Sequence, residues 1–245
     1  MIEWSEACDV TMPVDDKEPT IRLHVTSRME NQRTSGFFDK EPDTIAWLDQ
    51  LQPGDLFVDI GANIGVYSLY AAARRGARVI AFEPESQNYA ALNRNIHVNR
   101  LGHAISALPI ALSDQSGPTV LNLTAFRTGG SHSTVDEALG EGGKVFSPVF
   151  VQGTVSETLD TVLAALDGGA PRFVKIDVDG AEARVIAGMA QLLGSGTLEQ
   201  VLIELAPEQD STDAEIATTL NTAGYTAGPP AWQYHGRGNH IFRRT

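Results

Sequence analysis

Three features are scarce in this chain of 245 residues: cysteine, long apolar runs and positive charge. The one cysteine, Cys8, excludes an internal disulfide and a metal site built from cysteines. No apolar run approaches the ~20 residues of a membrane-spanning helix, and the first residues contain no basic segment followed by an apolar one. We therefore expect a cytoplasmic protein that carries no secretory signal and does not act at a membrane.

The shortage of positive charge bears on the choice of partner. The chain has 18 Lys and Arg against 31 Asp and Glu, which gives a formal net charge of −13. Such a chain repels polyanions at long range, and only the stretch "RGNHIFRR" near the C-terminus gathers basic residues. Nucleic acid is therefore a disfavoured partner.

Apolar runs of strand length alternate with helical patterns through most of the chain. Hydrophobic residues make up 42% of it, which is enough for the core of one large α/β domain. The predicted strands are 56–60, 78–83, 107–112, 119–123, 172–178, 200–205 and 239–244. Several of them are almost continuously apolar, which is typical of strands covered on both faces. We predict a Rossmann-like, mostly parallel sheet with helices on both faces and ligands at the carboxyl ends of its strands.

Two stretches lie outside this alternation. Residues 1–36 are mostly polar, with one alternating run, "TIRLHV", and we interpret them as an N-terminal extension of a domain at 37–245. Residues 124–148 are rich in glycine and long for a loop inside a compact domain. We expect the second stretch to form a substrate loop or a lid.

The first predicted strand of the domain runs into the turn "DIGANIG". Gly61 permits a sharp turn and Gly65 a close approach of the next helix, but Asn63 stands where a dinucleotide-binding turn has its central glycine. Asp59 would repel a pyrophosphate and suits a cationic ligand without phosphate, such as S-adenosylmethionine, unless it only caps the turn. Glu83, placed to bind ribose hydroxyls, suits any adenosine ligand, NAD included.

Seven motifs then follow one another: "FVDIGANIGVYS", "AFEPE", "ALSDQSG", "GGSHSTV", "ETLDTV", "FVKIDVDGAEARVIAGM" and "VLIEL". In this order they resemble the FkbM-type family of S-adenosylmethionine-dependent methyltransferases, and the resemblance extends from about Phe37 to the C-terminus. One departure is Asp179, since the family usually has a glutamate there.

The resemblance implies a class I methyltransferase fold with a seven-stranded sheet whose last hairpin carries one antiparallel strand. It also implies transfer of a methyl group from S-adenosyl-L-methionine to a hydroxyl of a small molecule, a sugar or a secondary metabolite. Ser113 and Asp114 would then lie near the adenine. The residues that we expect to hold the cofactor are Asp59, Gly61, Ala62, Asn63, Gly65, Glu83, Pro84, Ser113, Asp114 and Asp177.

Three residues are candidates for the catalytic chemistry, which requires an alcohol to lose a proton. Asp177, near the carboxyl end of its strand, would accept that proton or hold the ammonium of the cofactor. Lys175, on the same side of the strand, would lower the pKa of the hydroxyl, or it forms a structural ion pair with Asp177 or Glu204. His132, in the glycine-rich loop, has the pKa of a general base, although a histidine beside serines is commonly only solvated.

Other acidic residues near these candidates have simpler interpretations. Glu182 begins a helix, where a carboxylate is favoured by the dipole, so a cap is the preferred reading. Glu204 ends an apolar strand and needs either a partner or a function. A divalent ion bound by Asp177, Asp179 and Glu204 is the minority alternative, and we predict no metal.

Three other functions remain open at this point. One is an NAD-dependent oxidoreductase, which Asp59 and Asn63 disfavour, and another is a non-catalytic nucleotide-binding module on the same fold. The third is an RNA methyltransferase, which the acidic net charge disfavours. The sequence predicts neither the methyl acceptor nor the oligomeric state.

Overall fold

The computed structural model describes residues 8–12, 21–35, 41–131, 133–140, 144–166, 168–205, 210–228, 233–234 and 237–245. Its strands are β1 (Cys8–Met12), β2 (Ile21–Val25), β3 (Leu56–Ile60), β4 (Arg78–Phe82), β5 (Ile105–Leu108), β6 (Ala111–Leu112), β7 (Gly117–Leu123), β8 (Thr134–Val135), β9 (Leu139–Gly140), β10 (Lys144–Val145), β11 (Phe150–Glu157), β12 (Phe173–Ile176), β13 (Gln200–Leu205), β14 (Tyr225–Ala227), β15 (Gln233–Tyr234) and β16 (Arg237–Arg244). Its helices are α1 (Arg28–Ser35), α3 (Pro42–Leu48), α4 (Val66–Arg75), α5 (Ser86–Val98), α6 (Leu159–Ala165), α7 (Glu182–Ala187), α8 (Ala190–Gly194) and α9 (Ser211–Thr222).

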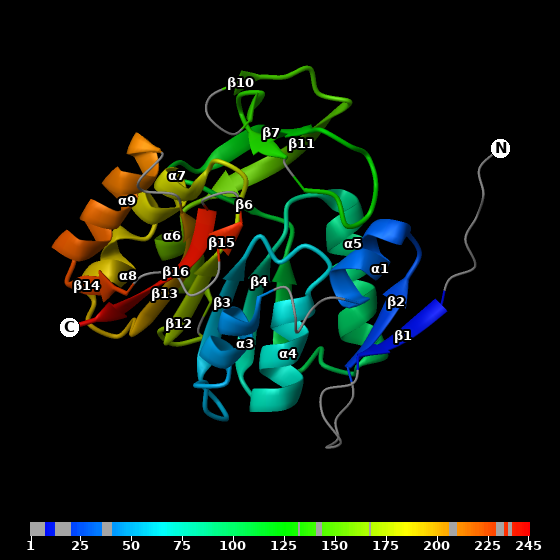
Figure 1. Cartoon of the computed structure of the whole chain (residues 1–245), viewed down its shortest axis with the longest axis horizontal. Helices are drawn as coiled ribbons and strands as arrows, with labels where there is room; N and C mark the ends of the chain where they lie inside the picture. Colours follow the sequence, from blue (N-terminus) through cyan, green and yellow to red (C-terminus); the bar gives the residue numbers. More distant parts are fainter. Residues whose placement is uncertain are drawn as a thin grey trace.

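The main sheet has the order β14-β16-β13-β12-β3-β4-β5, and the short β15 pairs with β16 (Figure 1). The pairs from β13 to β5 are parallel, whereas β16 runs antiparallel to both of its long neighbours. The predicted α/β class and the antiparallel strand of the last hairpin are confirmed. β3 and β12 lie at the centre, where the order of the strands reverses, and in such sheets ligands bind at this point.

Alternating side chains of the central strands pack on opposite faces of the sheet. Phe57 and Phe173 lie with α3, α4 and α5, and Trp47 of α3 stacks on Phe173 with 5.0 Å between ring centroids. Val58 and Val174, one position along, lie with the helices α6 to α9 on the other face. Because Asp59 and Lys175 share the parity of the two phenylalanines, both point toward α4.

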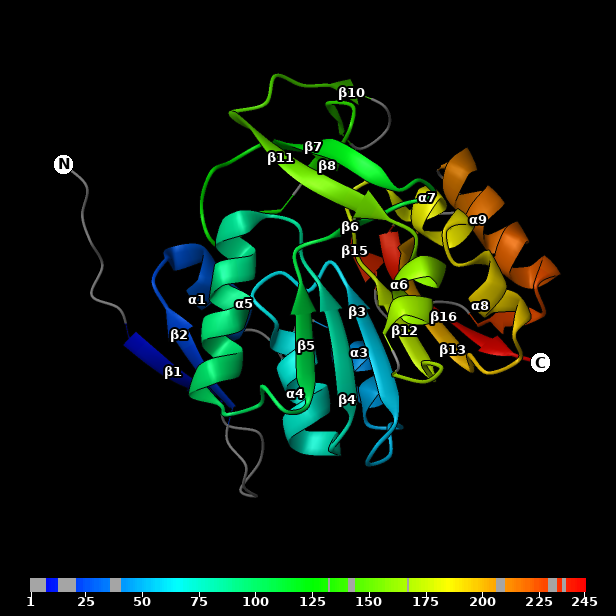
Figure 2. The same ribbon diagram turned by 180° about the vertical axis from the view of Figure 1, so that it is seen from behind.

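A second, four-stranded sheet of order β6-β11-β7-β8 lies across the carboxyl ends of the main strands (Figure 2). The predicted strand at 119–123 belongs to this sheet and not to the main one. Its long partner β11, which pairs with β7 over Phe150–Ser156, was not predicted. The predicted strand at 107–112 is divided between β5 and β6, one in each sheet.

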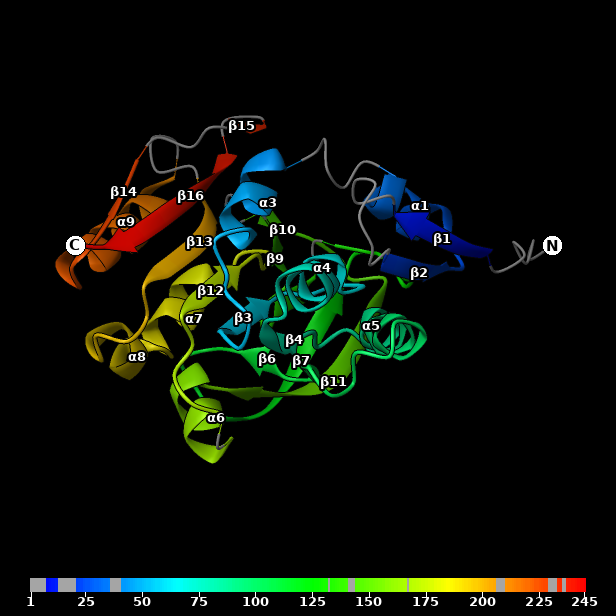
Figure 3. The same cartoon turned by 90° about the horizontal axis from the view of Figure 1, so that it is seen from below.

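The hairpin of β1 and β2 lies beside α5, with α1 next to it (Figure 3). Ile21, Leu23 and Val25, the residues of the predicted N-terminal strand, are buried in the same cluster as Leu92 of α5. Among the described residues, none of the helices has the length and apolar character needed to cross a bilayer.

Candidate functional site

The predicted turn between β3 and α4 has the geometry that its glycines suggest. Gly61 and Gly65 have φ of 80° and 90°, in the left-handed region that favours glycine. A Cβ on Gly61 would collide with the backbone carbonyl of Asp177, and one on Gly65 with the side chain of Leu92. Both glycines are therefore required for close packing. Gly61 lets the turn after β3 approach the end of β12, and Gly65 lets the start of α4 approach α5.

Asp59 is buried at the end of β3, with 1% of its surface exposed. Its Oδ2 accepts a hydrogen bond of 2.6 Å from the Ser68 hydroxyl of α4, whereas its Oδ1 has no partner among the described residues. Burial raises the pKa of Asp59, and the neighbouring Lys175 acts in the opposite direction. The carboxyl group thus retains one unsatisfied acceptor at the end of β3.

Lys175 and Asp177 form an ion pair of 2.6 Å between Nζ and Oδ2. Lys175 is 1% exposed, while the side chain of Asp177 is 47% exposed, so the lysine lies behind the carboxylate and away from solvent. Burial lowers the pKa of Lys175, but Asp177 and Asp59 outweigh it and hold the pKa above its ordinary value. Of the alternatives predicted for Lys175, the structure shows the ion pair with Asp177. The ammonium of Lys175 remains charged in this pair.

Two residues that the sequence analysis did not single out complete the surroundings of Lys175. The ring of Tyr67 lies 4.8 Å from its Nζ, and the Tyr67 hydroxyl donates a 2.6 Å hydrogen bond to Glu41, just before α3. Burial and Glu41 raise the pKa of Tyr67 well above its usual value, so the phenol stays protonated. Tyr67 lies two residues after Gly65, and this closeness to the glycine turn could have identified it from the sequence. Glu41 lies too far away in the sequence to be identified in this way.

Glu83, at the end of β4, faces the same turn. Its carboxylate accepts hydrogen bonds from the backbone N–H groups of Asn63, at 2.7 Å, and Glu85, at 3.0 Å. Burial raises its pKa to about 7, against the effect of these two donors. Glu83 therefore fixes the conformation of the turn, whose Asn63 has a left-handed φ of 51°.

Hydrogen bonds hold residues 128–130, in the middle of the chain, over this turn. The Asn63 side chain donates to the carbonyl of Gly130 at 2.8 Å, and Asn88 donates to the same oxygen at 3.2 Å while accepting from Gly129 N at 2.7 Å. Ser27, beside α1, donates to the carbonyl of Thr128. The first part of the predicted substrate loop is thus held between the glycine turn and the N-terminal unit. His132, the predicted base in this loop, lies outside the described residues.

Ser113 and Asp114 follow β6, and their side chains form hydrogen bonds within the protein. The Ser113 hydroxyl donates to Asp114, whose Oδ1 also accepts from Arg184 of α7 at 2.9 Å. The hydrogen bond from Arg184 lowers the pKa of Asp114. Arg184 spans two carboxylates, because its second nitrogen donates to Asp136 at 2.7 Å. Arg184 was not among the predicted site residues. It is a cation shortly after β12, in the same motif as Asp177, so the sequence contained a signal for it.

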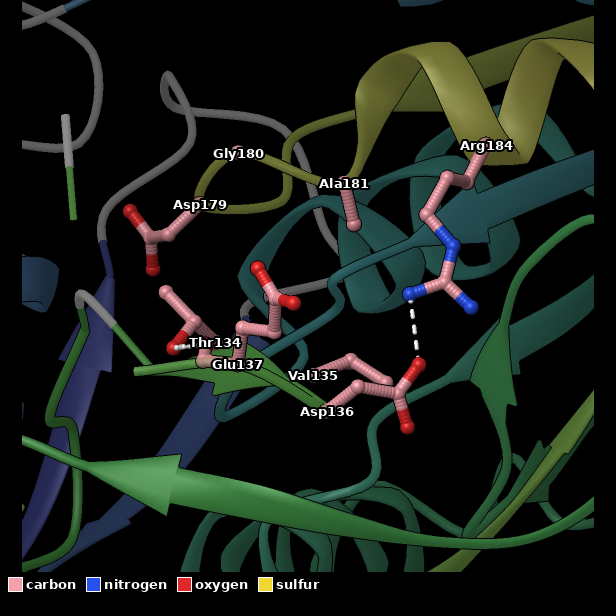
Figure 4. Close-up of a pocket in the computed structure, with 8 residues that line it drawn as sticks. All are labelled: Thr134, Val135, Asp136, Glu137, Asp179, Gly180, Ala181 and Arg184. Carbon is pink, nitrogen blue, oxygen red and sulfur yellow. Dashed lines mark hydrogen bonds and ion pairs between the residues drawn. The ribbon is translucent and has the colours of Figure 1, made fainter. Parts of the chain in front are cut away.

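Arg184 also closes one side of a pocket of about 260 Å³ (Figure 4). One wall comes from the strand β8 and the residues after it, and the other from the segment that starts two residues beyond Asp177. The lining residues are Thr134, Val135, Asp136, Glu137, Asp179, Gly180, Ala181 and Arg184. Figure 4 shows Asp179 and Thr134 on the left and Arg184 with Asp136 on the right, with the carboxyl group of Glu137 between them. The pocket is therefore rich in hydrogen-bond acceptors.

Two further carboxylates, Glu182 and Glu204, lie near these residues. Burial raises the pKa of Glu182 to about 8, and burial followed by Asp177 raises that of Glu204. Within the part of the chain that the structure describes, no three acidic, histidine or cysteine side chains are arranged to hold a metal ion.

The expected cofactor can be tested against these contacts. S-adenosylmethionine carries an ammonium, which needs a buried hydrogen-bond acceptor. It also carries a ribose, whose hydroxyls need a carboxylate at the neighbouring strand end. Asp59 offers the unsatisfied Oδ1, and Glu83 lies at the end of the neighbouring strand β4. The residues present fit this donor.

Known proteins provide a comparison for the geometry. Residues 59–227 match the model of the methyltransferase FkbM domain. The methyltransferase sdnD of Sordaria araneosa is 32% identical over 165 residues, 58% of this chain and 63% of sdnD, so the match spans less than two thirds of that relative. The 31-O-demethyl-FK506 methyltransferase FkbM of Streptomyces tacrolimicus is 29% identical over 198 residues, 72% of this chain and 75% of the relative.

A solved structure shares the fold. The crystal structure of methyltransferase FkbM from Methylobacillus flagellatus KT has a TM-score of 0.53 at 15% identity, over 81% of this chain and 50% of that one. The predicted Rossmann-like class I methyltransferase fold is confirmed. Since the family model covers well over half of the sequence, from the end of β3 to the end of β14, the chain belongs to the FkbM methyltransferase family.

Proposed function

We propose that this protein is an S-adenosylmethionine-dependent O-methyltransferase that acts on a hydroxyl of a small molecule, a sugar or a secondary metabolite. The observation that carries the proposal is the buried Asp59 at the tip of β3, whose Oδ1 lacks a partner among the described residues. A cationic donor satisfies this atom, whereas a pyrophosphate would be repelled by it. A relative named for methylation at an oxygen, the FkbM of Streptomyces tacrolimicus, supports the same chemistry.

When bound, the donor supplies an activated methyl group, and the chain has to position the acceptor and remove its proton. Asp59 and Glu83 hold the ammonium and the ribose hydroxyls. Asp177, exposed at the end of β12, accepts the hydroxyl proton. Lys175 orients that carboxylate from behind, since it is sealed from solvent and cannot contact the acceptor.

The pocket beyond Asp177 is our proposed acceptor site. Its walls carry Asp136, Glu137 and Asp179, which accept hydrogen bonds from hydroxyl groups. The one arginine of the pocket, Arg184, is already paired with two carboxylates. An acceptor with several hydroxyl groups therefore suits this lining.

The test combines donor binding with transfer. We expect calorimetry to detect binding of S-adenosylhomocysteine and none of NAD, and Asp59→Asn to weaken the former about tenfold or more, because it removes a charged hydrogen bond. We expect Asp177→Asn to reduce methyl transfer to a hydroxyl panel by 10²-fold or more, a typical effect of losing a general base, with little change in donor affinity.

Specific outcomes would contradict this proposal. Binding of NAD by the native protein would favour the oxidoreductase. Donor binding without transfer to any hydroxyl would favour a non-catalytic module. Loss of donor affinity alone in Asp177→Asn would reassign Asp177 from the acceptor to the ammonium.

A further inference from the structure

The exposed large hydrophobic side chains of the described residues are confined to the region of the second sheet. They are Val120, Phe126, Val145, Val149, Phe150, Val151 and Val155. Single exposed apolar residues are ordinary on a protein surface, but a contiguous group marks an interaction site. Val120, Val151 and Val155 share one face of the β7–β11 ribbon, because Val120 lies opposite Gly153 in the register. The inference drawn from them is independent of the proposed function.

The strand β11 also has a free edge. It pairs with β7 along Phe150–Ser156, but on its other side β6 reaches only Ser156 and Glu157. Within the described chain, positions 150–155 therefore have no strand on that side. In Figure 2, β11 runs across the front of β7, with this edge toward the viewer.

The backbone groups at this edge can be assigned from the register. Asp136 N donates to Val120 O, so the polar groups of Val120 face β8, and Gly153, which is opposite Val120, directs its own groups away from β7. The same holds two residues to either side, at Val151 and Val155. Ser113 N donates to Glu157 O, in agreement with this alternation. Three residues thus present N–H and C=O groups outward.

The sequence at the edge is nearly symmetrical about Gly153. In "VQGTV" a valine lies two residues before and two residues after the glycine, and each is separated from it by one polar residue. An antiparallel copy related by a two-fold axis at Gly153 would place Val151 opposite the partner subunit's Val155. All three outward-facing residues would then form hydrogen-bonded pairs, as an isologous interface requires.

The distribution of charge also favours a second copy of this chain as the partner at this edge. Residues 117–123 and 149–156 contain no charged side chain, although the chain is 20% charged and has a net charge of −13. Two copies of so acidic a protein can approach here without facing like charges. We propose that this edge is a homodimer interface, in which β11 of two copies joins their second sheets into one continuous sheet.

The experiment measures the oligomeric state of the whole chain by sedimentation equilibrium. Gly153→Pro removes the central edge N–H, and proline is tolerated on an edge strand where its N position faces outward. Gly153→Ala is the matched control, because a Cβ at this position meets no atom within 4 Å and the N–H is kept. We expect dimers for the native protein and Gly153→Ala, and a dissociation constant about tenfold or more higher for Gly153→Pro.

A pair of double variants tests the register without relying on proline. Val151→Lys with Val155→Lys puts like charges opposite each other and should yield monomers, whereas Val151→Lys with Val155→Glu puts opposite charges together and should retain the dimer. A monomeric native protein would overturn the proposal. So would a dimer that both Gly153→Pro and the double lysine variant leave intact, because the contact would then lie elsewhere.

Discussion

At the scale of single residues, the site depends on carboxylates that are buried to different extents. Asp59 is enclosed, Glu83 is nearly so, and Asp177 is half exposed. Desolvation raises the pKa of the enclosed pair, while the exposed one is held by a buried ammonium. Their positions could be predicted, because residues at the carboxyl ends of neighbouring parallel strands converge. Of the residues around Lys175, Tyr67 could have been found from its place beside the glycine turn, whereas Glu41 could not, because strand periodicity carries no information about which distant segment packs behind a strand.

The pKa of Glu83 leads to a prediction for stability. In the folded protein Glu83 keeps its proton up to about pH 7, whereas the unfolded chain releases it near 4.5. Its contribution therefore lowers the free energy of unfolding as pH rises through this window, by roughly 3 kcal/mol in all. We expect Glu83→Gln to reduce this decline in urea unfolding between pH 5 and about 7.

Glu157 is the control for Glu83, because the Ser116 hydroxyl lowers its pKa. Its stabilising contribution is fully present above its unfolded pKa of 4.5 and is lost only as pH falls below that value, so Glu157→Gln should leave the slope between pH 5 and about 7 unchanged. An unchanged profile in Glu83→Gln would mean that Glu83 is ionised in the folded state at every pH tested.

At the scale of elements, the closest contact of the site is the backbone crossing of the glycine turn and the end of β12. Gly61 and Gly54 both have left-handed φ, of 80° and 88°, but only a Cβ on Gly61 would collide with other atoms. We expect Gly61→Ala to destabilise the fold by about 3 kcal/mol or more and Gly54→Ala by only about 1 kcal/mol, the cost of the φ alone. Denaturant unfolding of the two variants measures the difference. Equal losses would show that the turn has room to move away from Asp177.

The loop at 127–131 supplies a second prediction at this scale. Asn88 is 3% exposed and makes both hydrogen bonds to Gly129 and Gly130, whereas Asn93 on the same helix is exposed. We expect Asn88→Ala to speed amide exchange in 127–131 and to cost about 1–3 kcal/mol, and Asn93→Ala to do neither. Slow exchange in Asn88→Ala would show that the contacts of Ser27 with Thr128 and of Asn63 with Gly130 are sufficient to hold the loop.

At the scale of the whole molecule, the sequence predicted one sheet, whereas the described residues form a main sheet and a second sheet of four strands. Alternation of strands and helices identified the fold, since parallel strands require covered faces. The assignment of 119–123 to the main sheet was wrong, because its pattern resembles that of any strand and its partner β11 lies some thirty residues further along. β11 itself was missed, because its exposed valines do not alternate with charged residues as the side chains of a half-buried strand usually do.

The central pairing of β3 with β12 has a consequence for synthesis. Asp59 and Lys175 are register partners separated by 116 residues (175 minus 59), so the carboxylate emerges from the ribosome long before its countercharge. Until then the carboxylate of Asp59 must remain hydrated or protonated, since burying it unpaired is costly. The N-terminal strands therefore cannot reach their final arrangement in the growing chain. The centre of the main sheet is therefore completed only after Lys175 has been synthesised.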